Sequence, residues 1–195
     1  MRLTGFVATP LLTLFLVTGT AAHAAPSPAA PTEPVFNNNI TLEEVRAAQQ
    51  AWGEALLNIS QTHRNSNQRR ARAVAERVID SAYAYNLGPV LFKPTLTHGE
   101  QTFRTTREGA LAYFVGGNRN FPNDSGFALK PWDKFAYQNA AVFINGNTAL
   151  TTGNVMLTDT EGNVTTVDKT WGFKKDEKGQ VRIVLHHSSL PFSPQ

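Results

Sequence analysis

The chain has 195 residues, with 18 Lys and Arg against 15 Asp and Glu, and it contains no cysteine. A formal charge of +3 is too small to indicate a nucleic-acid partner. The lack of cysteine excludes disulfide bonds, thiolate nucleophiles and cysteine metal ligands, so a hydrophobic core must hold the fold.

The first residues have the features of an export signal. Residues 1–24 contain Arg2, an apolar run over 6–17 and the small-residue pattern Ala22-His23-Ala24. This order predicts a secretory signal peptide that is cleaved after Ala24. The apolar run is too short to span a bilayer, so we expect a periplasmic or secreted protein with no membrane segment after cleavage.

A leader and one domain follow. Residues 25–40 are rich in proline and alanine and predict a flexible leader. Residues 41–195 are long enough to fold as a single domain. The segment Thr41-Leu-Glu-Glu44 has the spacing of a capping box, which predicts the start of a long amphipathic helix. The apolar stripe of this helix is Val45, Trp52, Leu56 and Ile59.

A second helical pattern runs over 70–85 and stops at Gly88-Pro89. The basic run 63–72 between the two patterns is interpreted as a solvated turn that connects the helices. The next apolar run, 90–92, is ended by Pro94, which favours a short strand or a sheet edge.

Thr105-Thr-Arg-Glu108 repeats the capping-box spacing, and the short third helix that it predicts ends at Gly116-Gly117. Residues 118–131 are predicted to form an irregular loop. Turn signals then separate four strands, 140–144, 148–158, 164–174 and 180–190. Helices followed by an antiparallel meander predict the α+β class.

The last strand ends in His186-His187-Ser188-Ser189, which is the strongest functional signal in the chain. Successive side chains of a strand point to opposite faces, so His186 shares a face with Ser188, and His187 with Ser189. One of these pairs can line a pocket, but not both. Further polar candidates stand where apolar patterns are interrupted: Thr95, Tyr113 and Thr170.

Each of these three candidates also has an ordinary structural interpretation. Thr95 suits a turn, Tyr113 suits a core tyrosine with a satisfied hydroxyl, and Thr170 suits a plain strand position. Asp168 and Lys169 are interpreted as an ion pair on the sheet surface. No carboxylate stands at a readable position behind either histidine, so no catalytic triad is evident.

A metal site is disfavoured by the histidine positions. Catalytic zinc needs three protein ligands and an open position. After removal of residues 1–24 the chain offers His63, His98, His186 and His187. The first two fall in predicted turns, and the last two face apart. We therefore expect no metal and no other cofactor, with Zn²⁺ as the alternative.

Several motifs together carry a family resemblance. They are Tyr-Asn-Leu-Gly-Pro-Val-Leu-Phe-Lys-Pro-Thr (85–95), Ala-Leu-Ala-Tyr-Phe-Val-Gly-Gly (110–117), Asp-Ser-Gly-Phe-Ala-Leu-Lys-Pro-Trp (124–132), Gly-Asn-Val (153–155), Val-Asp-Lys-Thr-Trp-Gly-Phe (167–173) and His-His-Ser-Ser-Leu-Pro (186–191). In this order they resemble the iota-class carbonic anhydrases of the nuclear-transport-factor-2-like, or SnoaL-like, superfamily. The resemblance covers essentially all of the domain.

The resemblance implies a conical barrel in which N-terminal helices pack on a curved antiparallel sheet. It implies reversible hydration of carbon dioxide to bicarbonate, and a homodimer formed through the sheet. Family members are described both with and without a metal, and the pocket is built from threonine, tyrosine, serine and histidine. The catalytic candidates carried over are Thr95, Tyr113, His186 and Ser188. The substrate-binding candidates are Thr170, His187 and Ser189.

The mechanism that we expect uses hydroxyl and imidazole groups. Tyr113, Thr95 and Ser188 hold a water beside carbon dioxide and stabilise the growing oxyanion, and His186 takes or passes on the released proton. Two other functions remain open at this stage. One is an isomerase or cyclase acting on a larger apolar ligand, which usually needs a buried acidic base. The other is a non-catalytic exported module that binds a small ligand.

Overall fold

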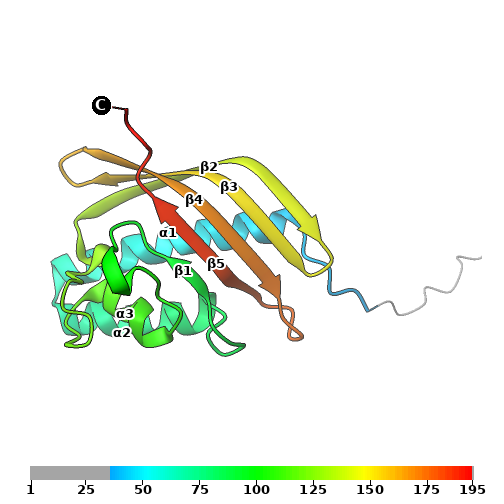
Figure 1. Cartoon of the computed structure of the whole chain (residues 1–195), viewed down its shortest axis with the longest axis horizontal. Coiled ribbons are helices and arrows are strands. Elements are labelled where there is room, and N and C mark those ends of the chain that lie inside the picture. Colours follow the sequence, from blue (N-terminus) through cyan, green and yellow to red (C-terminus); the bar gives the residue numbers. More distant parts are fainter. Residues whose placement is uncertain (1–35, 195) are drawn as a thin grey trace, which may run out of the picture. The chain divides into compact units, whose positions relative to one another are not determined.

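The computed structural model of the protein describes residues 36–194. In this part of the chain three α-helices pack against a five-stranded sheet (Figure 1). The expected signal peptide and most of the expected leader lie outside the described residues. Within the leader range, Ile40 is buried and its N–H donates to the carbonyl of Gly146 at 2.9 Å. Of the helices in residues 36–194, none combines the length and apolar character needed to cross a membrane.

The first helix, α1 (Leu42–Asn65), begins at the predicted capping box. Glu44 N–H donates to the Thr41 hydroxyl at 3.2 Å, and Thr41 N–H donates to the Glu44 carboxylate at 2.9 Å. The predicted apolar stripe is buried along its whole length, and it places the Trp52 indole toward the sheet. The prediction of this helix from its cap and its stripe is confirmed.

The second helix, α2 (Gln68–Ala82), is shorter at its C-terminal end than the pattern over 70–85 predicted. Tyr83 leaves the helix with extended backbone angles and forms a parallel bridge with Ile183 of the sheet. The basic run 63–72 is mostly helical and is not a turn, because α1 and α2 are joined only by Ser66 and Asn67.

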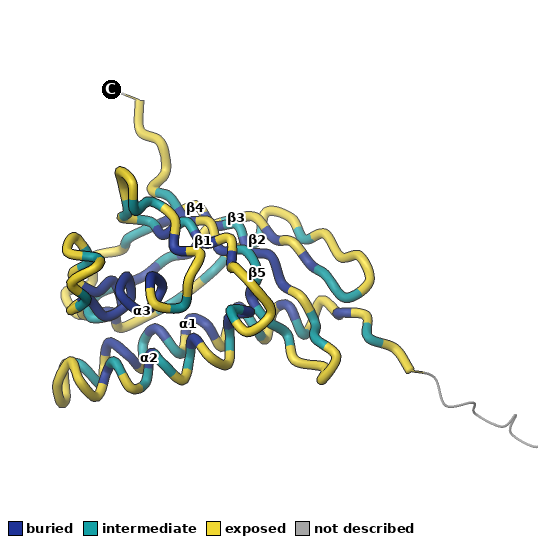
Figure 2. The backbone as a smooth tube through the Cα atoms, turned by 60° about the horizontal axis from the view of Figure 1, so that its bottom comes forward, coloured by how far each residue is buried: buried dark blue, intermediate teal, exposed yellow. Residues whose placement is uncertain are grey.

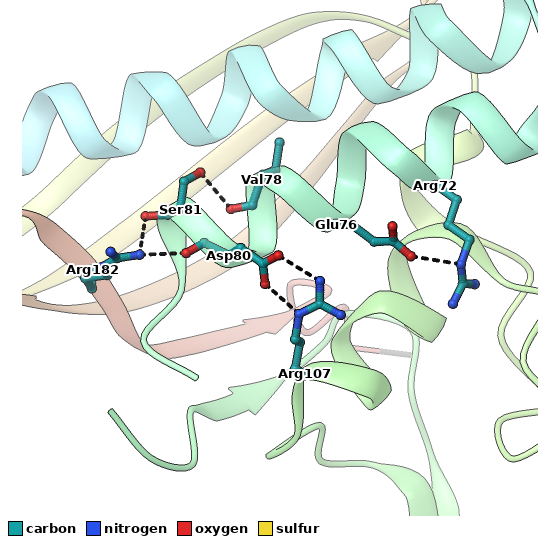
Figure 3. A network of polar contacts seen from close by, with 7 residues as sticks. All are labelled: Arg72, Glu76, Val78, Asp80, Ser81, Arg107 and Arg182. Carbon is teal, nitrogen blue, oxygen red and sulfur yellow. Dashed lines mark hydrogen bonds and ion pairs between the residues drawn. The ribbon is translucent and has the colours of Figure 1, made fainter. Parts of the chain in front are cut away.

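The end of α2 is fixed by two arginines from other elements (Figure 3). The Arg182 guanidinium donates to the carbonyls of Asp80 and Ser81, at 2.7 and 2.9 Å, which lack helical partners at a C-terminus. Arg107 donates to both carboxylate oxygens of Asp80 and holds the pKa of that carboxyl below its usual value. These contacts set where Tyr83 enters the interior.

After α2 the chain forms a short edge strand and the third helix. Strand β1 (Leu91–Lys93) pairs parallel to the last strand. The third helix, α3 (Arg107–Val115), is capped by Thr106, whose hydroxyl accepts from Gly109 N–H at 3.2 Å. The predicted cap at Thr105 was therefore wrong by one residue. The helix ends at Gly116, whose φ of 61° is the left-handed conformation that favours glycine.

The four long strands are β2 (Trp132–Asn145), β3 (Thr148–Asp159), β4 (Val164–Lys175) and β5 (Val181–Ser189). They form the predicted antiparallel meander, and β1 joins it in the order β1-β5-β4-β3-β2. The α+β class is confirmed. A wholly antiparallel sheet in a barrel was expected. The sheet is instead mixed, because β1 pairs parallel to β5, and it is open, because β1 and β2 form two free edges.

Strand β2 begins at Trp132 and not at Ala140, so its first half was missed. A bulge between Asn139 and Ala141 interrupts its pairing with β3. Gly153 lies opposite this bulge, and a Cβ atom there would stand 2.0 Å from the carbonyl oxygen of Gln138. The close approach of the two backbones therefore requires glycine at this position.

The two faces of the sheet differ in what they bury. Figure 2 shows the buried residues concentrated between the helices and the sheet. On the opposite face, a row of partner positions crosses all five strands, and we call it the outer apolar row. Its members are Phe143, Leu150, Gly172, Leu185 and Leu91. The three most exposed members are Leu91 at 62%, Phe143 at 61% and Leu150 at 43%.

Candidate active site

A small cavity lies between the helices and the inner face of the sheet. Its volume is about 10 Å³, which is room for about one water molecule. The walls are mostly aromatic and aliphatic, and four polar side chains interrupt them: Thr95, Tyr113, Lys169 and His186. Lys169 is 4% exposed and His186 is 2% exposed, so their polar atoms are shielded from solvent.

Strand alternation decides which histidine and which serine face the cavity side. His186 and Ser188 are buried on the inner face of β5, whereas His187 is exposed and Ser189 is half-buried. Of the two pairs that the sequence left open, the His186 and Ser188 pair is thus the inner one. The residues that lie opposite it on β4 are Trp171 and Lys169.

Two hydroxyls meet at one side of the cavity. Thr95, which follows β1, lies 2.7 Å from Ser188 between their Oγ atoms. Lys93 Nζ donates to the backbone carbonyl of Ser188 at 3.0 Å, which ties β1 to the end of β5. Thr95 lines the cavity, whereas Ser188 does not and only contacts the Thr95 hydroxyl from behind.

Among residues 36–194, the buried Tyr113 hydroxyl makes no hydrogen bond of normal geometry, although Thr95 and Leu96 lie near it. Burial raises the pKa of Tyr113, and the nearby Thr95 hydroxyl and the backbone of Thr95 and Leu96 partly offset this. A neutral phenol without a partner is free to donate to a bound group. Its ring stacks on Phe127 at 5.5 Å between centroids. The same two side chains also line an outer pocket of about 90 Å³.

His186 has both ring nitrogens engaged. Nδ1 is 2.8 Å from the Tyr83 hydroxyl, and Nε2 is in hydrogen-bond contact with Lys169 Nζ. Trp52 Nε1–H in turn donates to the Tyr83 oxygen at 2.9 Å. The imidazole therefore does not point a free nitrogen into the cavity. Lys169 and His186 both line the cavity, and Lys169 Nζ contacts the imidazole at Nε2.

Burial controls the ionisation of these groups. It holds the pKa of Lys169 well below its usual value. It also lowers the pKa of His186 well below its usual value, and neighbouring Lys169 and His187 act in the same direction. In the described part of the chain, no carboxylate lies within ion-pair distance of Lys169.

Lys169, Tyr83 and Trp52 were missed as site residues. The predicted ion pair between Asp168 and Lys169 was wrong, because adjacent strand residues face opposite sides. Asp168 is exposed and accepts a hydrogen bond from the Asn154 amide at 2.9 Å, while Lys169 points inward. The signal was present in the sequence, since Lys169 alternates with the inward apolar residues Val167 and Trp171.

The three substrate-binding candidates lie elsewhere. Thr170 and His187 are partners in the β4 and β5 register, on the face of the sheet that carries the outer apolar row. The Thr170 hydroxyl is 3.3 Å from that of Thr152 on the same face. Ser189 follows the same alternation. Within one chain the structure does not bring these residues to the cavity.

Residues 36–194 contain no cluster of side chains that could bind a metal ion. No three or more His, Cys, Asp or Glu side chains gather there closely enough to hold an ion. His98 is exposed, and His63 Nδ1 is 3.1 Å from the Leu129 carbonyl on another part of the fold. The polar groups of the cavity are thus two hydroxyls in its wall, a third behind them, an amine and an imidazole.

Fold and site together define an α+β protein with a small, buried and mostly apolar cavity that a few polar side chains interrupt. Comparison with known families makes this specific: a model of the metal-independent carbonic anhydrase family matches residues 43–190. A metal-independent carbonic anhydrase from Nostoc sp. is 60% identical over 159 residues, which is 82% of this chain and 78% of that protein. The chain belongs to the metal-independent carbonic anhydrase family.

Solved structures agree with this assignment. An iota-carbonic anhydrase from a cyanobacterium, crystallised in complex with bicarbonate, is 58% identical. The similarity covers 84% of this chain and 99% of that one, with a TM-score of 0.82. A protein described as a calcium/calmodulin-dependent protein kinase II association domain from Xanthomonas campestris shares the fold at 22% identity and a TM-score of 0.54, over 83% of this chain and 95% of that one. The predicted family and fold are thus confirmed, and the family is described as metal-independent.

Proposed function

We propose that this protein catalyses the reversible hydration of carbon dioxide to bicarbonate without a metal ion. The observation that carries the proposal is the cavity, in which a free phenol, a hydroxyl pair and an amine–imidazole pair meet. Family membership supports it, and so does the relative that is complexed with bicarbonate.

We expect the apolar walls of the cavity to bind carbon dioxide and the few hydrogen-bond donors to orient it. Carbon dioxide is apolar and suits the aromatic lining. Because the cavity has room for only about one water molecule, Tyr113 and Phe127 must shift toward the outer pocket to admit carbon dioxide. The Tyr113 hydroxyl donates to the oxygen on which negative charge grows. The Thr95 hydroxyl, oriented by Ser188, donates to the second oxygen or holds the attacking water.

Attack of the water forms one C–O bond, moves one C=O electron pair onto oxygen and releases a proton. Of the two roles expected for His186, taking the proton or passing it on, the second fits better, because both of its ring nitrogens are already hydrogen-bonded. We assign the proton to the Lys169–His186 pair, with Lys169 in contact with the water. A positioned base of this kind contributes about 10²–10⁴ in rate.

The test is stopped-flow carbon dioxide hydration by the purified, chelator-treated protein, with metal content measured on the same sample. We expect turnover without metal, and a fall of about 10²-fold or more in Tyr113→Phe, with a smaller fall in Ser188→Ala. Tyr137→Phe and Ser81→Ala are matched controls, because these hydroxyls contact only backbone carbonyls away from the cavity.

Two results would overturn the assignment. Wild-type rates in both site variants would remove the proposed roles of Tyr113 and Ser188. Bicarbonate binding without turnover by the wild-type protein would instead support the non-catalytic binding module.

We also propose that the protein forms a homodimer through its sheet. The outer apolar row supports this, because three large side chains in one row are exposed to solvent. Leu150→Asp places a charge near the centre of the row, and we expect it to halve the mass measured by light scattering. An unchanged mass, or a wild-type protein that is monomeric, contradicts the proposal.

Export to the periplasm or the medium is the corresponding proposal for the N-terminal segment. It is supported by the signal-peptide pattern of residues 1–24. N-terminal sequencing of protein from an expressing bacterium tests it. We expect mature chains that begin at Ala25, and uncleaved cytoplasmic chains contradict it.

A further inference from the structure

The buried hydrogen-bond chain from Trp52 to Lys169 has a direction. The indole N–H of Trp52 can only donate, so the Tyr83 oxygen accepts it. Among the described residues, the Tyr83 hydroxyl proton then has one acceptor, Nδ1 of His186. Because Nδ1 accepts, the proton of the neutral imidazole lies on Nε2, and this N–H donates to Lys169 Nζ. A nitrogen that accepts a hydrogen bond carries a lone pair, so Lys169 is an uncharged amine.

The reverse arrangement is less favourable. If Lys169 donates to Nε2, the Nδ1–H of His186 donates to Tyr83, and the Tyr83 hydroxyl proton is left buried with no acceptor in residues 36–194. An unsatisfied buried donor is the costlier choice. Lys169 Nζ also lies over the rings of Trp52 and Trp171, with centroids at 4.7 and 5.1 Å. Such ring faces attract an ammonium, but by less than it costs to bury a charge without a counter-ion.

The surroundings of Lys169 fit an uncharged amine. No carboxylate pairs with it in the described chain, and an ammonium buried without a counter-ion is strongly disfavoured. Its titratable neighbours are His186 on β5, Tyr83 beyond it and Tyr113 across the cavity on α3. Burial lowers its pKa, in agreement with the hydrogen-bond directions.

We propose that Lys169 is a carbamylation site for carbon dioxide. The Nζ lone pair adds to the carbon of carbon dioxide and forms an N–C bond, while one C=O electron pair moves onto oxygen. One proton then leaves nitrogen for water, which gives a carbamate anion and hydronium. The reaction needs no oxidant, metal or enzyme. A desolvated lysine amine is the form of this side chain that acts as a nucleophile.

The cavity offers donors for the carbamate oxygens. In the described part of the chain the Tyr113 hydroxyl has no other partner, and His186 Nε2–H is released when the amine lone pair is used. The Thr95 hydroxyl lines the same cavity. The free volume of about 10 Å³ is too small for the new group, so Tyr113 and Phe127 must shift toward the outer pocket of about 90 Å³.

The consequence for activity rests on the proposed function. A carbamate changes a neutral amine into an anion beside the reacting carbon, and it repels bicarbonate and removes the base. Carbon dioxide is thus both the substrate and a reversible inhibitor of the enzyme, with inhibition growing as its concentration rises.

The experiment uses the full protein in ¹³C-labelled bicarbonate solution. We expect one carbamate resonance by ¹³C NMR and, after alkylation of the carbamate to trap it, a modified peptide that contains Lys169. The signal is expected to vanish in Lys169→Arg and Lys169→Met and to persist in Lys134→Met, which removes an exposed lysine of β2. Peptide mapping of the wild-type protein gives the answer even where the Lys169 variants do not fold.

A modified peptide set that lacks Lys169, with only surface amines trapped, overturns the inference. Hydration is measured on the same preparation. Hydration without a Lys169 carbamate refutes the carbamylation alone, and a Lys169 carbamate without hydration refutes the enzymatic function alone.

Discussion

The uncharged state of Lys169 predicts an unusual dependence of stability on pH. Burial depresses the pKa of this amine in the folded protein, whereas the unfolded chain has the ordinary value of about 10.4. A depressed lysine pKa gives full stability above the unfolded value, and stability is lost as the pH falls toward the folded value. At pH values at which the Lys169 amine is neutral in the folded protein but charged in the unfolded chain, the free energy of unfolding rises by about 1.4 kcal/mol per pH unit.

Over the two pH units from about pH 7 to about pH 9, with the folded side chain neutral throughout, this amounts to about 3 kcal/mol. Other shifted groups in the cavity act outside this window. His186 has a lowered pKa and costs stability only below about pH 6.5, and Tyr83 and Tyr113 have raised pKa values and act above about pH 10. The pKa of Lys93 is also lowered by burial, but Lys93 is present in all the proteins compared.

Urea unfolding at the two pH values measures the effect. We expect the wild-type protein to gain about 3 kcal/mol from the lower to the higher pH, and Lys169→Met, an unbranched side chain one atom shorter, to lose most of that gain. The control Lys134→Met is expected to retain the wild-type slope. An equal pH dependence in Lys169→Met and wild type refutes the reasoning, because it means that the amine is charged in the fold.

Two further predictions concern the scaffold. Thr106→Ala removes the hydroxyl that caps α3 and is expected to cost about 1 kcal/mol in thermal unfolding. Thr105→Ala, one residue before it, is expected to change stability little. A larger loss of stability in Thr105→Ala than in Thr106→Ala contradicts the assigned cap. Gly153→Ala forces a Cβ against the Gln138 carbonyl and is expected to cost about 1–3 kcal/mol in urea unfolding. An unchanged free energy of unfolding in Gly153→Ala would show that the backbone at the bulge relaxes to accommodate the methyl group.

Local signals predicted the elements of the fold well. The capping box at Thr41 and the stripe through Trp52 depend on neighbours within a few turns, and they predicted α1 correctly. The start of β2 at Trp132 was missed because the turn-rich loop before it hid the alternation that begins at Phe135. Tyr83 was missed for a different reason, since only its pairing with Ile183 takes it out of the helical pattern.

The candidate site was predictable in part. The pairing of His186 with Ser188 on one face follows from strand alternation, but which face is the inner one depends on how the sheet packs on α1. Lys169 was within reach of the same rule. Strand alternation predicts that Lys169 faces inward, but Lys169 was assigned to the surface because charged side chains are usually exposed. That expectation fails where a lysine is held uncharged.

Strand β5 carries Leu185 on one face and His186 on the other, as consecutive residues. A single peptide unit therefore separates the half-buried Leu185 side chain of the outer apolar row from the imidazole. Any molecule that settles on that side and shifts the strand by a fraction of an ångström shifts the imidazole with it. The proposed dimer surface and the candidate site thus share one thickness of backbone at this strand, and a substitution on either face is expected to affect the other.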